Sequence, residues 1–166
     1  MARDAQRVLA VSVRCRGMAA VLLEGGDVLL WSTSRKGTQS TDKALEVIRR
    51  WVKTYRPDVL VTENPDQAGR KSGRQIRTLR ALVDMGSELD ILGLVVRRDQ
   101  SERNVYEQAA SFAAMCPELK RVVPQKPAIW KSEPRTVAVF EALGLARSAG
   151  LLRSIADRAV PPGGNL

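Results

Sequence analysis

The chain contains no histidine and only two cysteines, Cys15 and Cys116, among its 166 residues. The absence of histidine excludes Ser-His-Asp and Cys-His nucleophilic sites, and every metal site that depends on imidazole ligands. The cysteines lack CxxC spacing, and in a reducing compartment they are typical of ordinary packing residues. Any hydrolytic chemistry must therefore depend on carboxylates, together with a hard cation such as Mg²⁺ that prefers oxygen ligands.

Long hydrophobic runs are also absent. The longest, such as residues 8–13 and 91–96, fall far short of the roughly 20 residues that span a bilayer. The N-terminal residues pass directly into a strand-like pattern and do not resemble a cleavable signal. We therefore expect no membrane span and a cytoplasmic location. With 44% hydrophobic residues the chain can bury one core, so we expect a single domain over residues 1–155 and a disordered tail over residues 156–166.

Acidic residues are outnumbered, because the chain has 18 aspartates and glutamates against 27 lysines and arginines, a net charge of +9. A basic surface attracts anionic polymers, since neutralising phosphates releases the counterions condensed around them. The alternative is a generic basic surface without a specific partner. We expect DNA as the partner because of where the charge lies along the chain.

Hydrophobic periodicity predicts an alternation of strands and helices. The first three strands are joined by tight turns, which favours an antiparallel meander, and the helix that follows makes the fourth strand parallel to a neighbour. This is the order of the ribonuclease H-like fold, an α/β fold with a mixed five-stranded sheet flanked by helices. The expected strands are 8–13, 17–23, 28–32, 59–62 and 91–96, and the expected helices are 40–56, the later part of 68–85, 102–115 and about 132–149.

The second predicted helix has an apolar face and an arginine face. The arginines follow one another at spacings of four, three and three, which places them on one side of a helix. Such a row without interleaved acids repels itself unless an anion is nearby, although a solvated charged face is the common alternative. Phosphates would supply that anion. The row consists of Arg70, Arg74, Arg77 and Arg80.

Two glutamates stand in apolar surroundings where a charge needs a reason. Glu63 ends the fourth strand, in the stretch DVLVTEN, at an edge where the carboxyl ends of parallel strands meet. Glu141 lies within VFEALGLA, in a helix that must pack on the sheet. A bound cation would offset the cost of burying either carboxylate. The alternative for each is a charge that faces water at the surface.

The sequence resembles the RuvC-type Holliday junction resolvases, a branch of the ribonuclease H-like nuclease superfamily. The resemblance lies in RVLAVSVRCRGMAAVLL, RPDVLVTEN and FEALGLA, and it extends from about Arg7 to Ala149. It implies metal-dependent hydrolysis of phosphodiesters with Mg²⁺ or Mn²⁺, in which Glu63 and Glu141 match two of the catalytic, metal-binding acids. It also implies a homodimer, because a four-way DNA junction is two-fold symmetric.

The chain departs from this family at two acids. The family's first strand ends in an aspartate that bridges the metals, and Ser12 takes its place here. The other acid of the final helix falls on Ala138. A hydroxyl and a methyl group supply no negative charge where two divalent cations need it. Asp66, three residues after Glu63, is a possible substitute, although a turn residue that faces solvent is the more common alternative.

Two further charged residues lie near these positions in the sequence, and we make a separate prediction for each. Glu133 precedes Glu141 by two turns of the expected helix, about 12 Å at a rise of 1.5 Å per residue, which is too far to share one ion. Arg14 replaces a glycine of the family beside the site and could bind phosphate directly. The residues expected to bind nucleic acid are Arg14, Arg70, Lys71, Arg74, Arg77, Arg80, Lys131 and Arg135, and Trp130 could stack on a base or pack against the domain.

Three functions remain open. The first is a metal-dependent endonuclease that acts on branched or structured DNA through a degenerate acidic site. The second is a catalytically inactive ribonuclease H-like protein that binds such DNA. The third is an actin-like nucleotide-binding protein, which would need a glycine-rich turn after the first strand and a second similar domain. The stretch RCRG offers a single glycine, which makes the third hypothesis the weakest.

Overall fold

The computed structural model describes residues 5–69, 71–98, 104–128, 131 and 133–153. The predictions for Arg70, Trp130, Ser132 and the tail 156–166 lie outside the described residues. The elements, with short 3₁₀ helices written η, are β1 (Arg7–Val13), β2 (Met18–Glu24), β3 (Asp27–Ser34), η1 (Lys36–Thr38), α1 (Thr41–Tyr55), β4 (Val59–Glu63), η2 (Pro65–Gln67), α2 (Gly73–Glu88), β5 (Leu92–Val96), α3 (Val105–Met115), η3 (Pro117–Val122) and α4 (Val137–Ser148).

The strands form one mixed five-stranded sheet, as the sequence predicted, and their order is β3-β2-β1-β4-β5. The pairs β1/β2 and β2/β3 are antiparallel, whereas β1/β4 and β4/β5 are parallel. The parallel pairing places Ala10 of β1 beside Val61 of β4. The carboxyl ends of β1, β4 and β5 therefore lie at the same edge of the sheet, and Glu63 is the last residue of β4 there.

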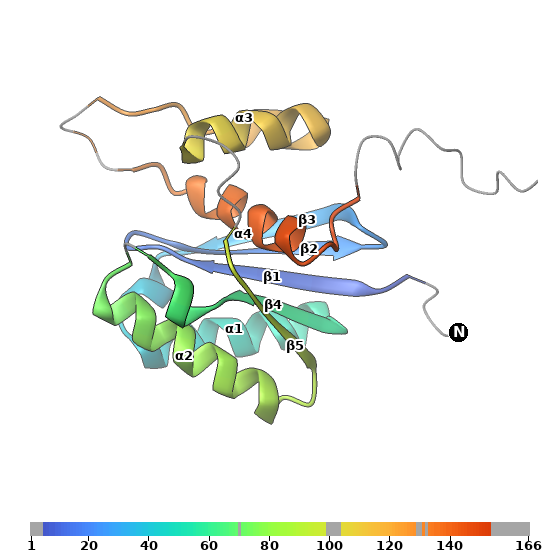
Figure 1. Ribbon diagram of the computed structural model, residues 1–166, viewed down its shortest axis with the longest axis vertical. Coiled ribbons are helices and arrows are strands. Elements are labelled where there is room, and N and C mark those ends of the chain that lie inside the picture. Colours follow the sequence, from blue (N-terminus) through green and yellow to red (C-terminus); the bar gives the residue numbers. More distant parts are fainter. Residues whose placement is uncertain (1–4, 70, 99–103, 129–130, 132, 154–166) are drawn as a thin grey trace, which may run out of the picture.

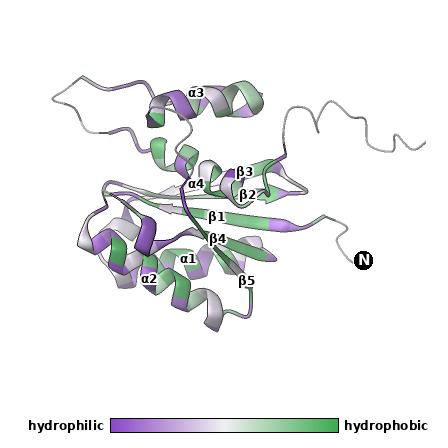
Figure 2. Ribbon diagram, in the orientation of Figure 1, coloured by the Kyte–Doolittle hydropathy of each residue, from purple (hydrophilic) through white to green (hydrophobic). Residues whose placement is uncertain are grey.

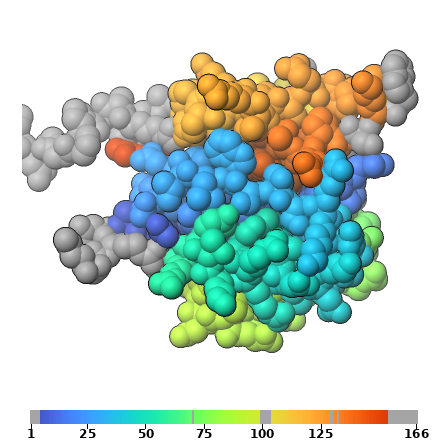
Figure 3. Space-filling model, turned by 180° about the vertical axis from the view of Figure 1, so that it is seen from behind, coloured from blue at the N-terminus to red at the C-terminus, as the bar shows by residue number. Residues whose placement is uncertain are grey.

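Helices cover both faces of the sheet (Figure 1). The helices α1 and α2 pack on one face, and α4 packs on the other, directly against β1 and β2. The helix α3 packs on α4, so it forms an outer layer on that side of the sheet. Seen from behind in Figure 3, β3 lies between the α1 side and the C-terminal helices.

Hydrophobic residues form a buried cluster on each side of the sheet, and Figure 2 shows how strongly they are concentrated along β1 and β4. Successive residues of β1 belong to opposite cores, because strand side chains alternate between the two faces. Leu9 and Val11 pack toward α1 and α2, while Val8 and Ala10 pack toward α4. The edge strand β5 is different, since Leu92 and Val95 are exposed. None of the described helices is long and apolar enough to cross a bilayer.

The start of α4 differs from the prediction. The sequence Ser-Glu-Pro favoured a helix from about residue 132, but α4 begins at Val137 after Thr136, which makes no side-chain cap. Glu133 lies before the helix, and its carboxylate accepts hydrogen bonds from Arg14, which is 119 residues away in the chain. A local capping signal carries no information on a partner so distant in sequence, so the prediction of this boundary was wrong.

Candidate functional site

Glu63 and Glu141 come together at the carboxyl end of the central strands. Glu63 ends β4, and Glu141 enters the same space from α4, which crosses β1 and β2. Both residues are 1% exposed. Two buried carboxylates at close quarters repel each other and have lost their hydration, so they need compensating positive charge.

The compensating charge between them is the ammonium group of Lys71. Its Nζ lies 2.8 Å from Glu63 Oε1, and it also pairs with Glu141 Oε1. The same nitrogen donates a hydrogen bond to the carbonyl oxygen of Val13, at the end of β1, over 2.5 Å. The sequence grouped Lys71 with the residues expected to bind nucleic acid, but its side chain is only 8% exposed and points into the protein.

Arg14 supplies a second internal cation. Its guanidinium donates to both carboxylate oxygens of Glu133, from Nε to Oε2 over 2.8 Å, and it also pairs with Glu141 Oε2. Arg98, which follows β5, lies 3.4 Å from the same oxygen of Glu141. Arg14 was expected to face phosphate, and its side chain is instead directed at two carboxylates. Glu133 and Glu141 share this arginine, although the sequence placed them two helical turns apart.

Ser12 and Ala138, the two positions at which the resemblance predicted missing acids, contact each other directly. Ser12 Oγ donates a hydrogen bond to the backbone carbonyl of Ala138 over 2.6 Å. Ser12 is fully buried, and this bond joins the end of β1 to the first turn of α4. The serine therefore links α4 to the sheet at the end of β1.

The pKa values of the two buried carboxyl groups shift in opposite directions, because burial dominates at one group and the internal cations dominate at the other. Burial raises the pKa of Glu63, and the opposing effect of Lys71 does not cancel it. Burial acts on Glu141 in the same sense, but Lys71 and Arg14 outweigh it and lower the pKa of this carboxyl group below 4.5. Burial alone would lower the pKa of Arg14, whereas the hydrogen bond and charge of Glu133 and the charge of Glu141 raise it. Glu141 is thus the charged centre of the cluster.

Replacing Ser12 with alanine is expected to lower the free energy of unfolding by about 1 kcal/mol, the usual value of one hydrogen bond. The lost bond is the one between Ser12 Oγ and the Ala138 carbonyl. For a domain of this size, thermal denaturation should show a melting temperature lower by about 2–4 °C. Ser148→Ala, at the exposed end of α4, is the control. An unchanged melting temperature in Ser12→Ala would show that this bond does not stabilise the fold.

Asp66 is not part of the acidic cluster. It lies in η2, where its backbone N–H donates to the side chain of Asn64, and its carboxylate pairs with Arg80 over 3.1 Å. The side chain of Asp66 is 75% exposed. The tight turn after β4 directs it to solvent, so Asp66 is the solvent-facing turn residue of the alternative and does not substitute for a missing acid.

The arginine face of α2 lies on the outside of the molecule. Arg74, Arg77 and Arg80 are exposed, and the apolar side of the helix contributes Leu79 and Leu82 to the core. Among the described residues, neither Arg74 nor Arg77 has an ion-pair partner, whereas Arg80 pairs with Asp66. Lys131 and Arg135, also predicted to bind nucleic acid, are exposed before α4.

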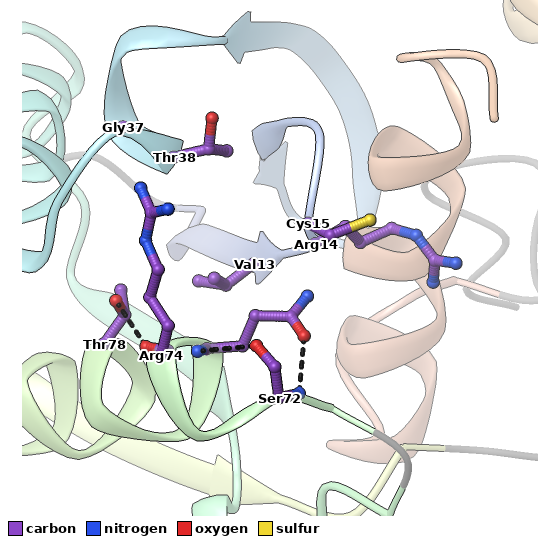
Figure 4. A pocket seen from close by; sticks show the side chains of 9 residues that line it. Val13, Arg14, Cys15, Gly37, Thr38, Ser72, Arg74 and Thr78 are labelled. Carbon is purple, nitrogen blue, oxygen red and sulfur yellow. Dashed lines mark hydrogen bonds between the residues drawn. The ribbon is translucent and has the colours of Figure 1, made fainter. Parts of the chain in front are cut away.

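A pocket lies between the end of β1, η1 and the first turns of α2 (Figure 4). Arg74 extends into it toward Thr38, whereas Arg14 points away from it toward α4. Ser72 caps α2 through a reciprocal pair of bonds with Gln75, which fixes the start of this helix. The lining therefore includes Arg14 and Arg74 but neither Glu63 nor Glu141.

The residues of the cluster do not fit a pair of divalent metal ions. Both Glu141 oxygens and Glu63 Oε1 are in contact with cationic nitrogens, and the hydroxyl hydrogen of Ser12 is donated to Ala138. Among the described residues, no three aspartates, glutamates or cysteines are grouped so that they could hold a metal ion. A two-metal site needs several free anionic oxygens at close range.

Comparison of the sequence with models of protein families and with curated proteins gives no match. Solved structures with a similar fold do exist. One is the Fowlpox virus resolvase in complex with Holliday junction DNA, with 14% identity, a TM-score of 0.53, and coverage of 89% of this chain and 100% of that one. Another is RuvC of Thermus thermophilus in complex with a Holliday junction substrate, with 12% identity, a TM-score of 0.51, and coverage of 88% and 94%.

The ribonuclease H-like fold of the resolvases is thus confirmed for this chain. The inward roles of Lys71 and Arg98 were not predicted from the sequence. Arg98 had a usable signal, because it follows a parallel strand at the edge where Glu63 also lies. Lys71 had none, since it stands in a loop next to an arginine row and its local sequence is typical of an exposed basic residue.

Proposed function

We propose that this protein binds branched DNA as a RuvC-like homodimer and does not hydrolyse it. The observation that carries this proposal is the exposed arginine face of α2, which borders an acidic cluster whose carboxylates are already paired with internal cations. The chain shares its fold with two resolvases that were solved together with Holliday junction DNA. That likeness supports a junction as the DNA structure to test first.

The charge distribution supports binding to the phosphate backbone. Arg74 and Arg77 are exposed on one side of α2, and Arg74 also lines the pocket near the end of β1. Guanidinium groups pair well with phosphate, because their N–H groups match its oxygens in geometry. Such contacts are insensitive to base sequence, so we expect selectivity for the shape of the DNA.

The state of the acidic cluster argues against hydrolysis. The first-strand position holds Ser12, the neighbouring helix position holds Ala138, and these two residues bond to each other. The remaining pair, Glu63 and Glu141, is engaged with Lys71. Activation of a water molecule by two metal ions needs carboxylates that are free to bind them.

A metal-dependent endonuclease is the second candidate. It is favoured by the position of Glu63 and Glu141, which share a buried site at the carboxyl end of the central strands. This hypothesis requires Mg²⁺ or Mn²⁺ to displace Lys71 when DNA binds. Dimerisation is common to both candidates, because a two-fold symmetric junction offers two equivalent surfaces.

One experiment separates these functions. Purified protein is mixed with a labelled four-way junction, or with duplex or single-stranded DNA made from the same sequences, in Mg²⁺, Mn²⁺ or EDTA. Gel shift and cleavage are read from the same samples. We expect a junction-selective shift that is equal in Mg²⁺ and EDTA, with the DNA intact. Metal-dependent cleavage that disappears in Glu63→Gln would establish the endonuclease instead, and the absence of any shift would contradict both.

A further inference from the structure

We propose that Lys71 is a built-in counter-ion that occupies the position between Glu63 and Glu141 where a two-metal nuclease holds a divalent cation. In this view the two glutamates are positioning residues. They anchor Lys71, and through it the start of the arginine-bearing helix α2. The part that concerns metal ions is independent of DNA, whereas the role in DNA binding rests on the function proposed above.

The surroundings of Lys71 Nζ match the needs of an ammonium group, which carries three N–H bonds. Two of its contacts are hydrogen bonds, to the Val13 carbonyl over 2.5 Å and to Glu141 Oε1. The third contact is an ion pair with Glu63 Oε1 at 2.8 Å. It is electrostatic, because this buried oxygen accepts no hydrogen bond of normal geometry. The side chain of Lys71 is 8% exposed, so water contributes little to its solvation.

The charges around this position are balanced without a metal ion. The carboxylates of Glu63, Glu133 and Glu141 face three cations, namely Lys71, Arg14 and Arg98. A divalent cation bound between Glu63 and Glu141 would meet the Lys71 ammonium at close range. It would have to expel a lysine that is bonded to two strands and a helix, at a cost that includes desolvation of the new ion.

The attachment of Lys71 to Glu63 and Glu141 also explains why both glutamates are present in a site where two other acids are missing. Lys71 directly precedes Ser72, the cap of α2, and its Nζ is bonded to the end of β1. The first turn of α2 carries Arg74, and the next turn carries Arg77. Fixing Lys71 therefore fixes the direction in which these arginines leave the surface. On the function proposed above, the carboxylates thus have a role in DNA binding that requires no hydrolysis.

The place of Lys71 is tested first by titrating DNA-free protein with Mn²⁺ and measuring bound Mn²⁺ by water-proton relaxation. Wild type and Glu63→Gln are expected to bind Mn²⁺ equally weakly. Lys71→Met vacates the position, so it should bind Mn²⁺ at least tenfold more tightly, and its melting temperature should rise when Mn²⁺ is added. Binding to wild type that is lost in Glu63→Gln would overturn the proposal, as would a folded Lys71→Met with no gain. If Lys71→Met does not fold, Mn²⁺ binding to wild type that is lost in Glu63→Gln still overturns the proposal.

The positioning role is tested by amide hydrogen exchange in metal-free buffer. In Lys71→Met, the first turn of α2 should exchange at least tenfold faster than in wild type, while the first turn of α1, capped by Ser40, stays unchanged. Equal exchange in α2 would overturn this half of the proposal. Failure of the proposed function is a separate result, because it is seen as a missing junction shift in wild type whatever the Mn²⁺ and exchange data show.

Discussion

Replacing Glu141 with glutamine is expected to lower the free energy of unfolding by about 3–5 kcal/mol, the usual cost of breaking a buried ion pair by removing one partner. The glutamate side chain is 0% exposed, and it faces Lys71, Arg14 and Arg98. Glutamine keeps the shape but leaves these cations without their common counter-charge. At about 2–4 °C per kcal/mol, the melting temperature should fall by roughly 6–20 °C.

Two other glutamates provide matched controls for this variant. Glu46→Gln removes an exposed ion pair with Lys36, so its melting temperature should match wild type. Glu63→Gln should have a clearly smaller effect than Glu141→Gln. Burial already disfavours the charged form of Glu63, and glutamine removes that cost together with the attraction of Lys71. Equal losses in Glu141→Gln and Glu46→Gln would contradict the central place of Glu141.

The pH dependence of stability provides an independent check on Glu141. Its pKa in the folded protein lies below the ordinary 4.5, so the stability it contributes is present above pH 4.5 and is lost as the pH falls through the folded pKa. Glu63 acts with the opposite sign, because its raised pKa favours folding with the proton bound. In Glu141→Gln, the acid-induced loss of stability below pH 4.5 should therefore be reduced, as measured by urea denaturation at a series of pH values.

The double variant Arg74→Glu, Arg77→Glu is expected to weaken junction binding on the order of 100-fold at about 50 mM salt. Each arginine that neutralises one phosphate contributes about 0.9 to the slope of log affinity against log salt, so the slope should shrink by about 2. Both side chains are exposed, so the melting temperature should not change. Binding is measured by fluorescence anisotropy with a labelled four-way junction at several salt concentrations.

A second double variant controls for net charge. Arg49 and Arg50 are exposed on α1, and their reversal to glutamate changes the charge of the protein by the same amount. If the face of α2 binds DNA, this control should lose far less affinity and keep most of its salt slope. Equal losses in the two double variants would show that binding depends on overall charge, and the assignment of α2 as the interface would then be abandoned.

Sequence patterns were sufficient for the fold because they are local. Strands such as β1 and β4 are short apolar runs bounded by turns, and α1 is opened by Ser40 and ends before Pro57. Periodicity and caps act over a few residues, so a single sequence contains them in full. The placement of Glu63 also followed, since a strand joined by a crossover helix lies parallel to its neighbour and ends at a shared edge.

The partners of the acidic residues were decided only by the tertiary structure. Lys71 and Glu141 are 70 residues apart, and Arg14 and Glu141 are 127 residues apart. Nothing in the sequence around Lys71 distinguishes a lysine that binds phosphate from one that turns inward. Its direction is set by the packing of α4 on β1 and β2, which brings Glu141 beside Glu63 at the end of β4. Two buried carboxylates at this place need a cation between them.

The sequence by itself determined the order of the elements and the arginine face of α2, and it placed Ser12 and Ala138 where the resemblance predicts acids. The tertiary structure decided what surrounds these positions, because it brought Ser12 against Ala138 and placed Lys71 between Glu63 and Glu141. The physical reason is the range of the interactions. Backbone propensity and hydrophobic alternation act between neighbours in the chain, whereas the cost of burying a charge is settled by whichever group the fold brings within reach.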